Sequence, residues 1–164
     1  MEFSAELTFR YWLPVILAAV VISIFSTQGF GETHTTKIII PILQWIFPSA
    51  SLHTLHLMHV GIRKLAHLAE YSVLSILVFR ALRAGRAGWR VSWALVTVLI
   101  AASYASLDEI HQIFVPGRGP AVHDIAIDTF GALLVQVMVW WYATIKWSYV
   151  ARSHARIGGT WPLP

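Results

Sequence analysis

The chain has 164 residues, of which 57% are apolar and 12% are charged, whereas about 25% of an average soluble domain is charged. This composition excludes a disordered chain, which would combine low hydrophobicity with high charge. It also argues against a soluble domain, because one small core could not bury so much apolar surface. The absence of cysteine excludes disulfides, thiolate metal sites and cysteine nucleophiles. We therefore expect a membrane protein.

Four segments are long and apolar enough to cross the hydrocarbon core of a bilayer, which takes about 20 residues of helix. They lie at about residues 11–29, 64–82, 91–112 and 122–146. The second is the least apolar, since it contains His67 and Glu70. The expected fold is an all-α polytopic bundle of four transmembrane helices. Residues 1–150 form its single domain, and residues 151–164 form a loose cytoplasmic tail.

The basic residues predict how this bundle is oriented. With a cytoplasmic N-terminus, eight Lys and Arg residues lie on the cytoplasmic side and four lie outside, which is the usual bias of membrane proteins. The eight are Arg10, Arg80, Arg83, Arg86, Arg90, Lys146, Arg152 and Arg156, and the four are Lys37, Arg63, Lys64 and Arg118. Both termini are therefore expected in the cytoplasm. The membrane orientation explains the net charge of +4, so we expect no nucleic-acid partner.

Residues 33–61 are expected outside the membrane. Ile38–Phe47 is too short to span and contains Pro41, so it predicts a short interfacial or re-entrant helical segment. After it, His53, His56 and His59 recur every third residue, which places them roughly on one face of a helix. A metal-binding stripe is one interpretation of this spacing. The solvated face of an interfacial helix is the interpretation that we favour.

The remaining polar residues gather at the outer ends of spans two, three and four. Within each of these spans, helical spacing places the polar residues on one face of the helix. Gly131 in the last span would let a neighbouring helix approach closely. Interhelical hydrogen bonding explains any one of these residues, but not so many ionisable groups at one end of the bundle. We therefore predict a functional pocket from Arg63, Lys64, His67, Glu70, Tyr71, Asp108, Glu109, His111, Gln112, Arg118, Asp124 and Asp128.

The charge of this predicted pocket limits its chemistry. Three basic and five acidic residues give a net charge of −2 when the histidines are neutral. A partly buried cluster with this charge should hold a shared proton, a protonated histidine or a bound cation. Mg²⁺ or Ca²⁺ would use the carboxylates and Zn²⁺ the histidines, but the spacing matches no standard metal motif. No cofactor is predicted, and a divalent cation at the acidic cluster stays an open alternative.

Two segments of the chain resemble the VanZ-like family of small bacterial membrane proteins. They are RKLAHLAEYSVL at residues 63–74 and SLDEIHQIFVPGRGPAVHDIAIDTFGALL at residues 106–134. The resemblance covers spans two to four and implies a multi-pass protein of the bacterial cytoplasmic membrane, with its site facing outward in the predicted orientation. It also implies a phenotype, because the founding member of the family is associated with low-level resistance to the glycopeptide teicoplanin. It implies no particular reaction.

Two kinds of function fit these residues. In the first, the protein is an enzyme that acts on a lipid-anchored or cell-wall precursor. The basic residues Arg63, Lys64 and Arg118 would bind a phosphate or carboxylate. His67 or Glu70 would be the base, and Asp108, Glu109 or His111 the partner acid or orienting group. Asp124 and Asp128 would hold Arg118 or a cation, and Tyr71 and Gln112 would also contact the substrate.

In the second, the protein is a non-catalytic lipid- or antibiotic-binding protein or a subunit of a larger membrane assembly. Its expected partners are a membrane lipid or a lipid-linked headgroup, with another membrane protein, or a second copy of the chain in a homo-oligomer, as a further possibility. This alternative rests on the missing nucleophile, since Ser106 is taken as the only serine near the cluster and points away from the Asp108 face. Ion transport is not expected, because the inner two-thirds of spans three and four carry no ionisable group.

Overall fold

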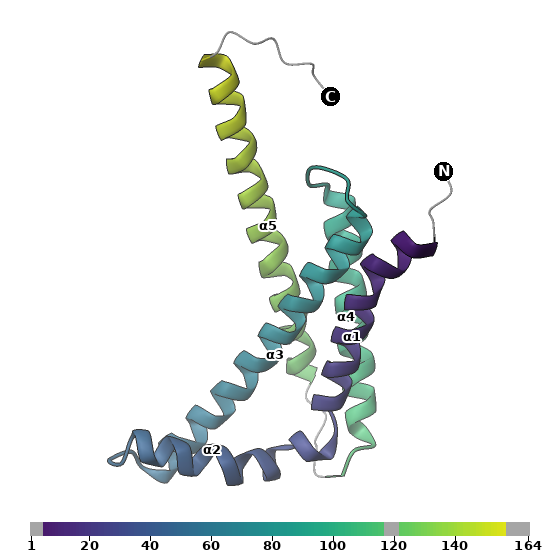
Figure 1. Cartoon of the computed structure of the whole chain (residues 1–164). Helices are drawn as coiled ribbons and strands as arrows, with labels where there is room; N and C mark the ends of the chain where they lie inside the picture. Colours follow the sequence, from purple (N-terminus) through teal and green to yellow (C-terminus); the bar gives the residue numbers. More distant parts are fainter. Residues whose placement is uncertain (1–4, 117–121, 157–164) are drawn as a thin grey trace.

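The protein is a bundle of helices in a computed structural model that describes residues 5–116 and 122–156, and no strand occurs among these residues (Figure 1). The helices are α1 (Ala5–Phe25), the 3₁₀ turn η1 (Gln28–Phe30), α2 (Glu32–Ile46), α3 (Leu52–Arg83), α4 (Val91–Ile113) and α5 (Val122–Arg156).

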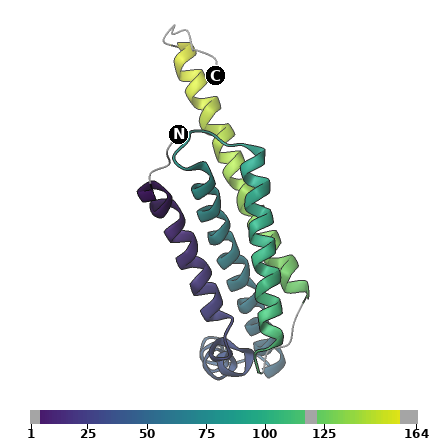
Figure 2. The same cartoon turned by 90° about the vertical axis from the view of Figure 1, so that its right-hand side faces the viewer.

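Four of the helices, α1, α3, α4 and α5, run along one another, and α2 lies across one end of the bundle (Figures 1 and 2). The start of α3, the end of α4 and the start of α5 lie at the α2 end. The start of α1, the turn between α3 and α4, and the end of α5 lie at the opposite end. Helix α3 packs against α1, α2, α4 and α5, and is therefore the central helix of the fold.

The helices identify a multi-pass membrane protein. Helices α3, α4 and residues 122–146 of α5 are each long and apolar enough to cross a membrane. Helices α1 and α2 pass the same test as a pair bent by 69°, either as one broken span or as a re-entrant loop. Large apolar side chains face outward, with Leu17, Leu99 and Met138 exposed by 55%, 65% and 57%. The all-helical membrane fold is thus confirmed with three or four candidate spans, and the orientation in the membrane stays a prediction.

Helix α3 is longer than the span predicted from the sequence. Its N-cap, Ser51, accepts a hydrogen bond from the backbone N–H of Thr54 at 3.2 Å, and the helix then continues without interruption to Arg83. Residues 52–63 therefore belong to the same helix as the predicted span at 64–82. The physical reason is the absence of a strong helix breaker, since this stretch has no proline and Gly61 is its only glycine.

The histidine stripe at the start of α3 is only partly solvated. His53 and His56 are exposed, whereas His59 is completely buried under α2. The His59 ring nitrogens Nε2 and Nδ1 lie 3.0 Å from the Thr35 hydroxyl and 3.3 Å from the Thr36 hydroxyl. The prediction of a solvated face is therefore wrong for His59, because α2 folds back against this side of α3.

The predicted loose tail is also helical in part. Helix α5 continues to Arg156, so residues 151–156 extend the last helix, and residues 157–164 lie outside the described part of the chain. No glycine or proline occurs between Gly131 and Gly158, which leaves the backbone free to continue its helical hydrogen bonds.

Helices α3 and α5 approach closely at Gly131, as its position in the sequence predicts. A Cβ atom at Gly131 would lie 2.6 Å from the backbone oxygen of Leu68, so only glycine fits there. The Ser72 and Ser75 hydroxyls donate hydrogen bonds to the carbonyl oxygens of Gly131 and Ala132 at 3.1 and 3.0 Å. The small residue thus brings the α5 backbone within reach of short α3 side chains.

Replacing Gly131→Ala is expected to lower the free energy of unfolding by about 1–3 kcal/mol, the usual cost of overpacking a tight contact. The measurement is thermal unfolding in a mild detergent. Gly61→Ala is the matched control, because a Cβ atom there meets nothing within 4 Å, and its midpoint should stay unchanged or rise. Equal destabilisation by the two variants would contradict the close contact at Gly131.

Candidate functional site

A pocket of about 220 Å³ opens between the end of α1, η1, α2 and α3. Helix α3 contributes Arg63, His67 and Glu70, which lie at i, i+4 and i+7 and so share one helix face. The other polar lining residues are Ser26 and Thr35. The apolar part of the wall comprises Phe25, Phe30, Ile39, Ile62 and Ala66. The pocket therefore combines a cation, a carboxylate and an imidazole with an apolar wall.

Arg63 connects the wall of the pocket to the segment that covers it. Its Nη1 atom donates hydrogen bonds to the backbone oxygen of Phe30 at 3.1 Å and to the Thr35 hydroxyl at 3.2 Å. A guanidinium has five N–H donors, so these contacts orient the group and leave donors for an anion.

His67 lies next to a buried carboxylate. Its Nδ1 atom is 3.5 Å from Oδ1 of Asp128, which is an ion-pair distance when the imidazole is protonated. The side chain of Asp128 is 2% exposed and that of His67 is 17% exposed. The two atoms form no hydrogen bond in the structure, so the contact is one of charge, and it leaves Nε2 as the nitrogen for proton exchange.

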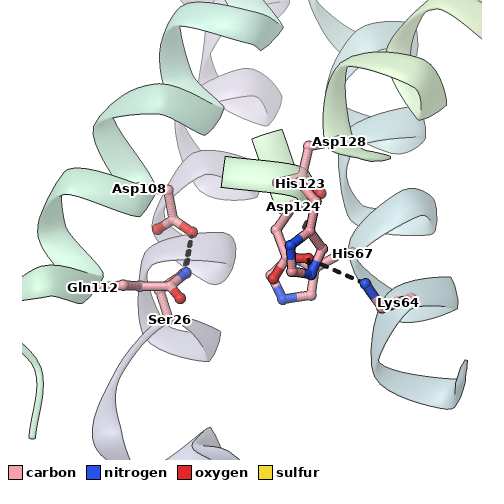
Figure 3. A network of polar contacts seen from close by, with 8 residues as sticks. All are labelled: Ser26, Lys64, His67, Asp108, Gln112, His123, Asp124 and Asp128. Atoms are coloured by element: carbon pink, nitrogen blue, oxygen red, sulfur yellow. Dashed lines mark hydrogen bonds and ion pairs between the residues drawn. The ribbon is translucent and has the colours of Figure 1, made fainter. Parts of the chain in front are cut away.

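A more exposed pair extends the same contact between α3 and α5. The Lys64 ammonium lies 3.6 Å from Oδ1 of Asp124, and Nε2 of His123 lies 3.2 Å from the same oxygen (Figure 3). The sequence predicts that Asp124 and Asp128 hold Arg118 or a cation. In the structure, the basic neighbours of these two carboxylates are Lys64 and His67. Arg118 itself lies outside the described residues.

A second polar cluster lies on the other side of the close-up view, where α4 meets the end of α1 (Figure 3). Oδ2 of Asp108 accepts hydrogen bonds from the Ser26 hydroxyl at 2.7 Å and from the Gln112 amide at 2.8 Å. All three side chains are buried, and Ser26 also lines the pocket. The prediction that Ser106 is the only serine near the cluster is therefore wrong. Ser106 donates to the Ala102 carbonyl of its own helix at 2.9 Å.

Tyr71 lies between the two clusters. It is completely buried, and its hydroxyl has no hydrogen-bond partner among the described residues. This hydroxyl is within range of the charges of both Asp108 and Asp128. A buried hydroxyl without a partner is energetically unfavourable, so the Tyr71 side chain has an unused donor at the centre of the polar region.

The last two predicted residues of α4 differ in their surroundings. Glu109 is buried, at 5% exposure, whereas His111 is exposed and does not share the buried face of Asp108 and Gln112. Within residues 5–116 and 122–156, no three His, Asp or Glu side chains are grouped so that they could hold a metal ion.

The sequence of the whole bundle matches a known family. A family model described as VanZ/LLP1 matches residues 11–144, from α1 to near the end of the apolar part of α5. The chain belongs to this VanZ-like family. No curated protein and no solved structure matches it.

The pocket of this VanZ-like protein includes residues that the sequence did not predict. Ser26, Thr35 and Phe30 come from the end of α1, α2 and the turn between them, whereas the polar clusters evident in the sequence lie in the later spans. No pattern distinguishes Ser26 from the other serines of the chain. It becomes part of the site only because the bend after α1 brings it to Asp108.

Replacing Asp108→Ala is expected to lower the free energy of unfolding by about 1–3 kcal/mol for each donor that it leaves buried without a partner. Asp108→Asn is the matched variant, because an amide oxygen at the position of Oδ2 can accept the bonds from both Ser26 and Gln112. Thermal unfolding in detergent should therefore distinguish a destabilised Asp108→Ala from a near-normal Asp108→Asn. Equal loss of stability in both variants would show that the hydrogen bonds are not the main contribution.

Proposed function

We propose that this VanZ-like protein binds the phosphate-bearing headgroup of a lipid or a lipid-linked cell-envelope precursor in the pocket between α1, α2 and α3. The observation that carries the proposal is Arg63 within the pocket wall, held in place by Phe30 and Thr35. An oriented guanidinium is well suited to a phosphate, since it offers several donors in one plane.

The rest of the pocket favours an amphipathic ligand over a small soluble anion. Phe25, Phe30 and Ile62 give it an apolar wall beside Arg63 and Glu70. The outward faces of the surrounding helices are apolar, so a ligand can approach from the bilayer itself. Arg63 would hold the phosphate, and Glu70 would accept hydrogen bonds from hydroxyl or amino groups of the headgroup.

A second candidate function is hydrolysis or transfer at the bound headgroup. It is supported by His67, which lines the pocket with the Asp128 carboxylate beside its Nδ1 atom. An imidazole beside a carboxylate can take a proton at Nε2 from water or from a hydroxyl nucleophile. The Ser26 hydroxyl is a candidate nucleophile, because it lines the same pocket and its proton already points to the Asp108 carboxylate.

The cellular role that we propose follows from the family. The protein would reside in the bacterial cytoplasmic membrane, with the pocket at the extracytoplasmic face, and would increase tolerance of teicoplanin. Its partners would be membrane lipids or lipid-linked headgroups, and a membrane-protein partner or a second copy of the chain would complete the assembly. The orientation rests on the distribution of Lys and Arg, most of which lie at the end opposite the pocket.

Replacing Arg63→Gln is expected to weaken binding of a polyprenyl phosphate by about 10-fold or more, because a charge-assisted hydrogen bond contributes about 1.5–3 kcal/mol. The measurement is native mass spectrometry of the full chain in detergent, with the uncharged polyprenol as the reference ligand. Lys37→Gln is the control, since it removes the same charge from an exposed position on α2 outside the pocket.

Equal affinity of the Arg63→Gln and Lys37→Gln variants would contradict the proposed phosphate contact. The same comparison can be made in cells, where Arg63→Gln, Glu70→Gln and Asp108→Asn should each remove the tolerance of teicoplanin that the normal chain confers. Normal tolerance in all three variants, at normal membrane levels, would overturn the role of the pocket.

The proposed orientation predicts which positions react with a membrane-impermeant maleimide in intact spheroplasts. The natural chain has no cysteine, so single variants report one position each. Thr33→Cys on α2 should be labelled directly, whereas Ala87→Cys in the turn between α3 and α4 should be labelled only after permeabilisation. Both positions are exposed and lie at opposite ends of the bundle. The reverse pattern would place the pocket on the cytoplasmic side.

A further inference from the structure

A second and larger pocket, of about 500 Å³, lies at the other end of the bundle. It is formed by the end of α3, the turn at residues 85–89 and residues 139–146 of α5. Figures 1 and 2 show α5 extending beyond the turn that joins α3 to α4. None of its lining residues belongs to the pocket that contains Arg63.

The charges of this pocket are all positive. Arg83, Arg86 and Lys146 line it, and no Asp or Glu is among its lining residues. None of the three forms an ion pair with another residue that the structure describes. The acidic residues of α2, α3, α4 and α5 lie toward the opposite end, and Glu6 at the start of α1 does not line the pocket, so the three cations share a hollow whose lining holds no carboxylate. Such an arrangement favours an anionic ligand.

The backbone at the end of α3 holds one of these cations in place. Nε of Arg86 donates to the carbonyl of Arg83 at 2.9 Å, and Nη2 donates to the carbonyl of Leu82 at 2.6 Å. The guanidinium also lies 4.9 Å from the centre of the Trp93 ring. Gly85 and Gly88 adopt φ angles of +79° and +86°. Residues with a side chain rarely adopt such positive φ angles, so the two glycines allow the backbone of the turn to fold in this way.

An apolar pocket of about 240 Å³ adjoins the basic one, between α4 and α5. The two pockets share Trp89, whose indole N–H is buried and has no hydrogen-bond partner among the described residues. The remaining walls of the apolar pocket include Leu95, Val98, Leu133 and Val137. A basic pocket with an unused indole donor therefore opens next to an apolar pocket whose walls include the exposed side chains of Leu95 and Val137.

We propose that these two adjoining pockets bind one anionic phospholipid. Its phosphate lies among Arg83, Arg86 and Lys146, and one acyl chain lies in the apolar pocket between α4 and α5. The Trp89 indole N–H donates to the glycerol or ester region, which joins the two parts of such a lipid. A free phosphate ion carries the same anionic group as the lipid headgroup and could bind the three cations in the same way. The adjoining apolar pocket favours a lipid, because it can hold an acyl chain.

The test compares lipids and variants of the full chain in detergent. Phosphatidylglycerol should bind more tightly than phosphatidylcholine by native mass spectrometry and should raise the thermal unfolding midpoint more. The double variant Arg83→Gln with Lys146→Gln should lose at least about 10-fold in phosphatidylglycerol affinity, because two charge-assisted contacts are removed. Arg86 is left unchanged, because its bonds to the end of α3 also stabilise the helix.

Arg80→Gln is the matched control. Arg80 lies at the same end of α3 but over the Tyr11 ring, at 5.3 Å from its centre, and does not line the pocket. Its variant should bind phosphatidylglycerol normally. An equal loss in the control, or equal binding of the two lipids, would overturn the proposal. A further outcome is that inorganic phosphate raises the unfolding midpoint as much as phosphatidylglycerol does. That result would show a site for small anions and would overturn the proposal of a lipid ligand.

Discussion

The structure depends on the close contact between the backbones of α3 and α5 at Gly131. A side chain at this position would collide with the carbonyl of Leu68, and its absence lets the two helices pack closely where they cross. The hydroxyls of Ser72 and Ser75 then reach α5 carbonyls, and His67 lies beside Asp128. Apolar side chains gain little by leaving lipid for a helix interface, so close packing and hydrogen bonds must hold such a pair together.

Because α3 contacts every other helix, both proposed sites depend on it. Near its start, Arg63 and His67 face the pocket under α2, and at its end Arg83 faces the basic pocket beside α5. The carboxylates of α2, α3, α4 and α5 gather toward the first end and most of the basic residues toward the second. This separation fits a bilayer, where charged groups avoid the middle of the hydrocarbon layer, and it gives the two ends of one bundle different ligand chemistry.

The spacing of polar residues predicted much of the site, although not its contacts. The i, i+4 pair Asp108 and Gln112 shares a buried face and a hydrogen bond, as helical periodicity requires. The same periodicity could not tell that Asp128 pairs with His67, because that contact depends on how far α3 and α5 are shifted along each other. His111 is exposed because the helices that pack against α4 decide which face of α4 is buried, and the residue type at position 111 does not.

The sequence by itself determined that this is a helical membrane protein of the VanZ-like family, since long apolar segments and two local motifs are properties of consecutive residues. It also determined that Gly131 would allow a close helix contact. Only the tertiary structure decided that Ser26 meets Asp108, that α2 buries His59 and that Arg63 faces a pocket. These contacts join residues far apart in the chain, and their geometry is set by the bend between α1 and α2 and by the packing of the helices around α3.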